Sequence, residues 1–202
     1  MTFSEFYQAF ERNKFYIFSF EDVLSVFPNE QNNSIKKALY RWKKKGRIQS
    51  LKKGLYELSY PKDFFVPDLY VANKLYYPSY ISLETALSNY SIIPEVAMAV
   101  TSITTKPTRS FKNKHGLFTF RTIKTDAFCG YYVEKHRNLE ILIAEPEKAL
   151  IDYIYFKVYN NKYFDFRDER FDKNIIAGLK KRKLNKYAKQ FNLNPKEFHA
   201  IF

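Results

Sequence analysis

The sequence predicts an α+β protein with a helical N-terminal domain, residues 1–60, and a mixed α/β C-terminal domain with an antiparallel sheet, residues 61–202. Three observations predict this. Apolar residues recur at helical spacing early in the chain, a basic strand pair with a tight turn follows, and the second half combines helical segments with a block of strand-like runs from about Val96. At 202 residues and 46% hydrophobic, the chain is long enough for a small domain and a medium one.

Three short helices are expected first. Aromatic residues at three- and four-residue spacings predict a helix over residues 3–13. Ser19 is placed as the N-cap of a second helix, which Pro28 ends. The turn and cap at 32–34 lead to a third helix from about Ile35 to Lys45, stopped by Gly46.

A hairpin is expected next, because the runs RIQSL and LYEL are joined by Lys52-Lys53-Gly54, and Gly54 can supply a positive φ. Three helices followed by a basic hairpin within about 60 residues is the order of a winged helix-turn-helix, in which the hairpin is the wing. The stretch 59–67 has two prolines and no period, which indicates a linker.

The second half starts with two expected helices. The first covers residues 68–76, and the second begins after Ser82, which is placed as its N-cap. The strand-like runs AMAVTSITT, GLFTFRTI, FCGYYV and LEILIA follow, and alternation in LFTFRTI suits an antiparallel sheet with one solvated face. Residues 144–159 predict a long, largely buried helix with Pro146 in its first turn. Two short helical patterns follow from Asp172.

Positive charge is concentrated on the third helix and the hairpin. The net charge is +13, and Ser34 to Lys53 contains nine Lys or Arg and no acid. Helical spacing buries Ile35, Ala38, Leu39 and Trp42 on one face and exposes the cations on the other. A solvated charged face is the plainer explanation, but surface helices usually mix signs. We therefore predict that the third helix and the hairpin contact DNA. The predicted contacts on the helix are Ser34, Lys36, Lys37, Tyr40, Arg41, Lys43 and Lys44, and those on the wing are Lys52 and Lys53.

A second basic cluster near the C-terminal end includes Lys180, Lys181 and Arg182 and has no acid. Such runs are usually solvated, and contact with DNA or an acidic partner is the alternative.

The sequence contains no recognisable pattern of catalytic or metal-binding residues. The five glycines form no phosphate-binding loop, the three histidines are scattered, and no second cysteine joins Cys129. No acid-x-Lys pair supports a nuclease, and the acid pair Glu145-x-Glu147 fits a helix start. We expect no enzyme activity, no metal and no cofactor. A single cysteine, no basic-then-apolar leader and no long apolar run favour a cytoplasmic protein without a membrane partner.

The order of motifs resembles the AbiEi-like antitoxins of type IV toxin–antitoxin, or abortive-infection, systems. The resemblance rests on YPSYISLETALSNYSIIPE (77–95), VTSITTKPTR (100–109) and IAEPEKALIDYIY (143–155), which follow the basic N-terminal region. It implies a repressor that binds inverted repeats in its own promoter and counteracts a nucleotidyltransferase-like toxin in phage defence. Ser91 departs from the glycine frequent in that family, and the tail after about residue 160 has no counterpart.

The resemblance also implies roles for residues outside the basic helix. The matching positions Ser82, Glu84, Pro146, Glu147, Leu150 and Asp152 are assigned to the core, and Lys106 and Arg109 are candidates for partner contact. A dimer on DNA is expected from the symmetry of the repeats. The rival hypotheses are a protein- or RNA-interaction module without an operator and, more weakly, a metal-dependent nuclease.

Overall fold

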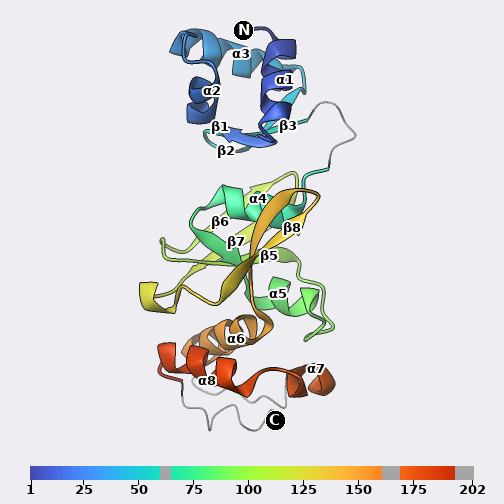
Figure 1. Ribbon diagram of the computed structural model, residues 1–202, viewed down its shortest axis with the longest axis vertical. Coiled ribbons are helices and arrows are strands. Elements are labelled where there is room, and N and C mark those ends of the chain that lie inside the picture. The colour runs from blue at the N-terminus through green and yellow to red at the C-terminus, as the bar shows by residue number, and fades with distance from the viewer. Residues whose placement is uncertain (60–64, 161–168, 194–202) are drawn as a thin grey trace. The chain divides into compact units, whose positions relative to one another are not determined.

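The structure is a computed structural model that describes residues 1–59, 65–160 and 169–193 (Figure 1). The chain forms two compact units. The first comprises Met1–Leu75 with Asn113–His115, and the second comprises Tyr76–Lys112 with Gly116–Phe202. Helices and strands occur in both, which confirms the α+β class. The first unit extends past the predicted boundary at residue 60, and residues 60–64 of the predicted linker lie outside the described part.

The first unit alternates helices and strands before its hairpin. Its elements in order are α1 (Phe3–Arg12), β1 (Ile17–Ser19), α2 (Phe20–Val26), α3 (Asn32–Lys44), β2 (Ile48–Lys52), β3 (Leu55–Leu58) and α4 (Asp68–Leu75). The strands form an antiparallel sheet in the order β1-β3-β2, with α1, α2 and α3 on one side of it (Figure 1). The short strand β1 was not predicted, because three residues carry too little period to be recognised.

Local signals account for where these helices begin and end. Ser19 caps α2 as predicted, since its hydroxyl accepts from the Asp22 amide while the Asp22 carboxylate accepts from the Ser19 amide. Helix α3 begins at Asn32, three residues before the predicted start, and Gln31 is its N-cap without a side-chain hydrogen bond. Gly46, just past α3, has a φ of +66°, the left-handed conformation that glycine tolerates best.

The core of the first unit is largely aromatic. Phe6 stacks on Phe10 with ring centroids 4.2 Å apart and lies 4.6 Å from Trp42. The apolar face of α3 is buried against this cluster as predicted, by Ile35, Ala38, Leu39 and Trp42. The opposite face of α3 is thereby fixed outward.

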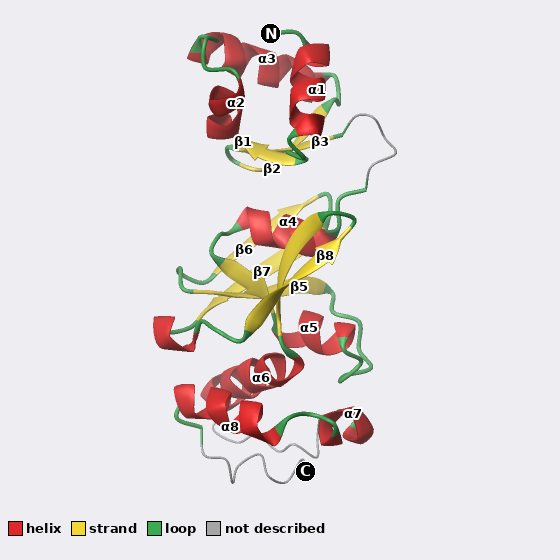
Figure 2. Cartoon of the chain, in the orientation of Figure 1, coloured by secondary structure: helices red, strands yellow, loops and turns green. Residues whose placement is uncertain are grey.

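The second unit is a six-stranded sheet with helices. Its elements are β4 (Ser79–Ile81), α5 (Leu83–Asn89), β5 (Ala99–Thr104), β6 (Arg109–Asn113), β7 (Gly116–Thr122), the 3₁₀ turn η1 (Thr125–Ala127), β8 (Tyr131–His136), β9 (Leu139–Ala144), α6 (Pro146–Asn160), α7 (Lys173–Ala177) and α8 (Lys181–Gln190). Helix α6 packs against α5 and α8, and Figure 2 shows α6 between the sheet and α8. No helix among the described residues has the length and apolar character needed to cross a membrane.

The sheet is mixed, which corrects the predicted antiparallel sheet. Its strand order is β6-β7-β5-β4-β9-β8, and both the β5–β7 and β4–β9 pairs are parallel. The alternation in β7 correctly marked its two faces, since Phe118 and Phe120 are buried. Alternation follows from the pleat of one strand and carries no information about the direction of its neighbours.

Candidate nucleic-acid interface

The exposed face of α3 carries all the residues predicted to contact DNA from this helix. Every one of Ser34, Lys36, Lys37, Tyr40, Arg41, Lys43 and Lys44 is exposed. The helix follows α2 after a five-residue connection, Phe27–Gln31. Burial of the opposite face against the aromatic core holds these side chains in solvent.

No acidic side chain among the described residues pairs with the cations of α3. Two of these cations lie near aromatic rings instead: Lys44 Nζ lies 4.9 Å from the centroid of Tyr40, and Lys36 Nζ lies 5.8 Å from that of Phe20. Both are cation–π distances, which leave the positive charge uncompensated. The α3 face therefore presents a positive potential with no negative partner in the part of the chain that the structure describes.

A hollow of about 370 Å³ lies on this face, lined by Ser34, Lys37, Tyr40 and Arg41. It combines a hydroxyl, two cations and an aromatic ring that is 61% exposed. These groups can donate hydrogen bonds and offer apolar contact, the two kinds of interaction by which base edges are read. We call this set the α3 hollow.

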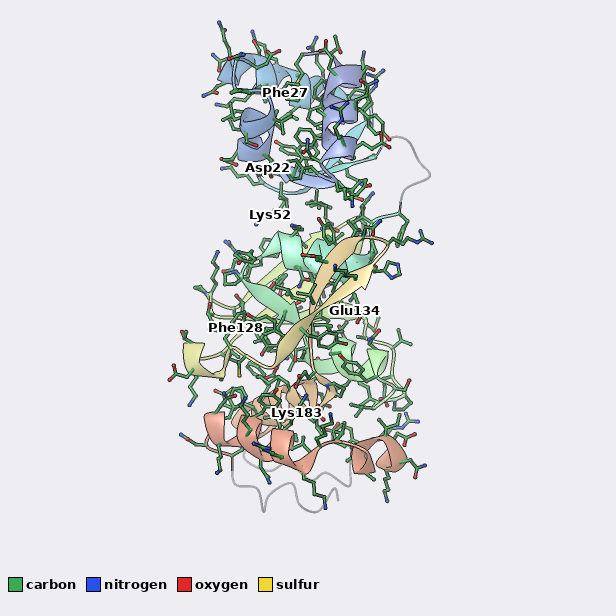
Figure 3. All side chains as sticks on the ribbon, in the orientation of Figure 1. Asp22, Phe27, Lys52, Phe128, Glu134 and Lys183 are labelled. Carbon is green, nitrogen blue, oxygen red and sulfur yellow. The ribbon has the colours of Figure 1, made fainter. Side chains whose placement is uncertain are left out.

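The two hairpin lysines differ in their surroundings. Lys53 is exposed in the two-residue turn with Gly54, whose φ is +78°. Lys52 is half-buried, and its Nζ donates to the Leu75 carbonyl at 2.5 Å (Figure 3). Of the two lysines, only Lys53 therefore has its ammonium group exposed to solvent. The sequence could not distinguish them, because they are adjacent and chemically identical.

The candidate partner-binding residues lie on separate elements of the second unit. Lys106 and Arg109 are exposed after β5 and at the start of β6, and each lies over a ring, those of Tyr76 and Phe111. Lys180, Lys181 and Arg182 are exposed at the start of α8, and the backbone amide of Lys180 donates to Glu147 at 3.0 Å.

Two motifs of the predicted core meet in a buried polar network. Tyr80 and Ser82 donate to Asp152 Oδ2 at 3.0 and 2.8 Å, and Lys148 Nζ donates to Asp152 Oδ1. All four residues are completely buried. Burial raises the pKa of Asp152, although the Lys148 ammonium and the two hydroxyls oppose that rise. The four-residue spacing of Lys148 and Asp152 signalled a helical ion pair, but nothing in the sequence joined it to Tyr80 and Ser82.

A second charged cluster lies within the first unit. His115 Nδ1 contacts Asp68 Oδ1 and its Nε2 contacts Glu57 Oε2, both at 2.8 Å. Burial alone would lower the pKa of His115, but the hydrogen bonds to Asp68 and Glu57 outweigh it and raise the pKa to about 9. Below this pKa both ring nitrogens donate, so that His115 links Glu57 to Asp68 within the first unit.

Sequence comparison adds no relative: no family model matches the chain, and no curated protein is significantly similar to it. No group of three or more His, Cys, Asp or Glu in the described part of the chain is placed to hold a metal ion.

Proposed function

We propose that this protein is a sequence-specific DNA-binding repressor that regulates its own operon and also acts as an antitoxin, without enzymatic activity. The observation that carries the proposal is the α3 face, which displays five cations and no acid. A helix face whose cations have no acidic partner in the described part of the chain is complementary in charge to a phosphate backbone.

The order of elements in the first unit supports the DNA-binding part. The sequence α1-β1-α2-α3-β2-β3 with sheet order β1-β3-β2 is the arrangement we assign to a winged helix-turn-helix, with α3 as the recognition helix. In that assignment the α3 hollow faces base edges, and the flanking lysines contact phosphates. The β2–β3 turn is the wing, where Lys53 supplies a phosphate contact.

The antitoxin part rests on the motif resemblance. The segments YISLETAL and PEKALID contribute the four residues of the buried network around Asp152, which is consistent with their assignment to a shared core. The candidate contacts with a nucleotidyltransferase-like toxin are the exposed residues Lys106, Arg109, Lys180, Lys181 and Arg182. A dimer on inverted repeats is the proposed DNA-bound state.

A fluorescence anisotropy titration tests the DNA-binding part. The labelled DNA comes from upstream of the protein's own gene, scrambled DNA of the same composition is the comparison, and two salt concentrations are used. We expect preference for the upstream DNA and a steep loss of affinity with salt, because each neutralised phosphate releases about 0.9 counterion.

The triple variant Lys36→Ala, Lys37→Ala, Arg41→Ala tests α3 directly. It should abolish specific binding, because Lys37 and Arg41 line the α3 hollow, and lower the salt slope by about one unit for the phosphate contact of Lys36. The control Arg12→Ala, Lys14→Ala, Lys74→Ala removes the same charge from exposed sites outside α3 and should bind normally.

An unchanged titration for the α3 variant would refute the recognition-helix assignment. Equal affinity for upstream and scrambled DNA would instead favour an interaction module without an operator. Co-expression with the product of the neighbouring gene tests the antitoxin part separately, since loss of toxicity should require this protein.

A further inference from the structure

The second unit contains a cavity of about 430 Å³. Its walls come from the start of α5, the loop 93–98, β5, β7, α6 and the pair Glu169–Arg170. The volume lies within the range of small-molecule sites, which combine apolar walls with a few fixed polar groups. The charges and the apolar wall of this cavity define what it can hold.

Three of the charged residues that line the cavity are already neutralised. Arg170 Nη1 pairs with Glu95 Oε1 at 3.2 Å. Glu169 accepts from the Tyr153 hydroxyl at 2.6 Å and pairs with Lys157 at 3.0 Å. A charged group on a ligand is therefore not required to balance these three residues.

The other two charged residues of the cavity, Glu84 and Arg121, form no ion pair within the part of the chain that the structure describes. Both are half-buried. The Arg121 guanidinium lies 5.2 Å from the centroid of Phe156, a cation–π contact that positions the group without neutralising it. The helix dipole favours an acid in the first turn of α5, which gives Glu84 a structural reason. No such reason applies to Arg121, which lies in β7. The cavity thus holds one unpaired anion and one unpaired cation.

The apolar wall of the cavity is unusually exposed. Met98 is 99% exposed and Val96 is 85% exposed, beside the buried Ile93. Methionine is flexible and polarisable, so it adapts to varied apolar groups. A ligand with an apolar body would cover this wall.

We propose that the cavity binds a zwitterion with an apolar body, that is, an apolar α-amino acid or a short apolar peptide. The ammonium pairs with Glu84, the carboxylate pairs with Arg121, and the apolar group packs on Val96 and Met98. The proposal uses the second unit alone and stands independently of DNA binding.

Isothermal titration calorimetry on the full chain tests the proposal with L-leucine, L-phenylalanine and the dipeptide leucyl-leucine. N-acetyl-L-phenylalanine amide, which lacks both charges, is the matched probe. We expect at least one zwitterion to bind with a Kd below about 1 mM and the blocked probe to bind at least tenfold more weakly, since charge-assisted hydrogen bonds are lost. If the amino acids bind, the ligand class is a free amino acid. If only the dipeptide binds, the ligand class is a short peptide.

The variants Glu84→Gln and Arg121→Gln should each weaken zwitterion binding about tenfold or more, whereas Arg121→Lys, which keeps the charge, should retain most of it. Glu140→Gln and Arg137→Gln change the same residue types at exposed positions outside the cavity and should leave binding unchanged. Thermal unfolding of each unliganded variant establishes that it is folded. The absence of saturable binding for every zwitterion, or binding that Glu84→Gln and Arg121→Gln leave unaltered, would overturn the proposal.

Discussion

Replacing Asp152 by alanine removes the carboxylate that Lys148, Tyr80 and Ser82 share in the core of the second unit. All four side chains are at most 1% exposed, so water cannot replace the lost acceptor. Breaking a buried ion pair by deleting one partner costs about 3–5 kcal/mol, because the remaining charge is left uncompensated. The two hydroxyls lose their acceptor as well. We therefore expect Asp152→Ala to lower the free energy of unfolding by at least about 3 kcal/mol.

The double variant Lys148→Met, Asp152→Leu distinguishes this explanation from simple loss of packing. It removes both charges and fills the site with apolar groups, which can be neutral or stabilising for a buried pair. The hydroxyls of Tyr80 and Ser82 stay unsatisfied, at about 1–3 kcal/mol each if no other acceptor is found. The double variant should nevertheless be more stable than Asp152→Ala, although it changes more residues.

Urea denaturation followed by far-UV circular dichroism measures these free energies. The only tryptophan, Trp42, lies in the first unit, so its fluorescence recorded in parallel reports that unit by itself. The reasoning would be refuted if Asp152→Ala cost less than about 1 kcal/mol, or if the double variant were less stable than the single one.

Two further predictions concern local conformation and pH. Ser91 has a φ of +56°, so Ser91→Gly should stabilise the protein by up to about 1 kcal/mol, whereas Ser88→Gly in α5 should destabilise it by about 0.5–1 kcal/mol. A lower melting temperature for Ser91→Gly than for wild type would contradict this. The raised pKa of His115, about 9, means that its charged form stabilises the folded first unit most fully below pH 6.5, and this contribution is lost as the pH rises through 9. His115→Gln should flatten the decline of the tryptophan-monitored urea midpoint between pH 7 and 9, and the exposed His136→Gln should leave it unaltered.

Residues close in sequence determined much of the candidate interface. The apolar spacing of α3 predicted which face is buried and therefore which cations are exposed, because helical geometry relates positions three and four apart without reference to the rest of the fold. The cap at Ser19 and the helix with Pro146 in its first turn were predicted for the same reason, since capping and first-turn preferences act within a few residues.

Only the tertiary structure decided what distant segments do together. The direction of each strand and the position of β4 between β5 and β9 depend on partners far away in the sequence. The hydrogen bond from Lys52 to the Leu75 carbonyl depends on such a partner as well. The sequence likewise could not show that Glu84 and Arg121 lack an ion-pair partner among the described residues. That became clear only because the structure pairs the other charged residues of the cavity with one another or with Lys157. The sequence by itself therefore determined which face of α3 is polar, and the fold determined which polar groups already have a partner. Pairing is a property of contacts in space rather than of local periodicity.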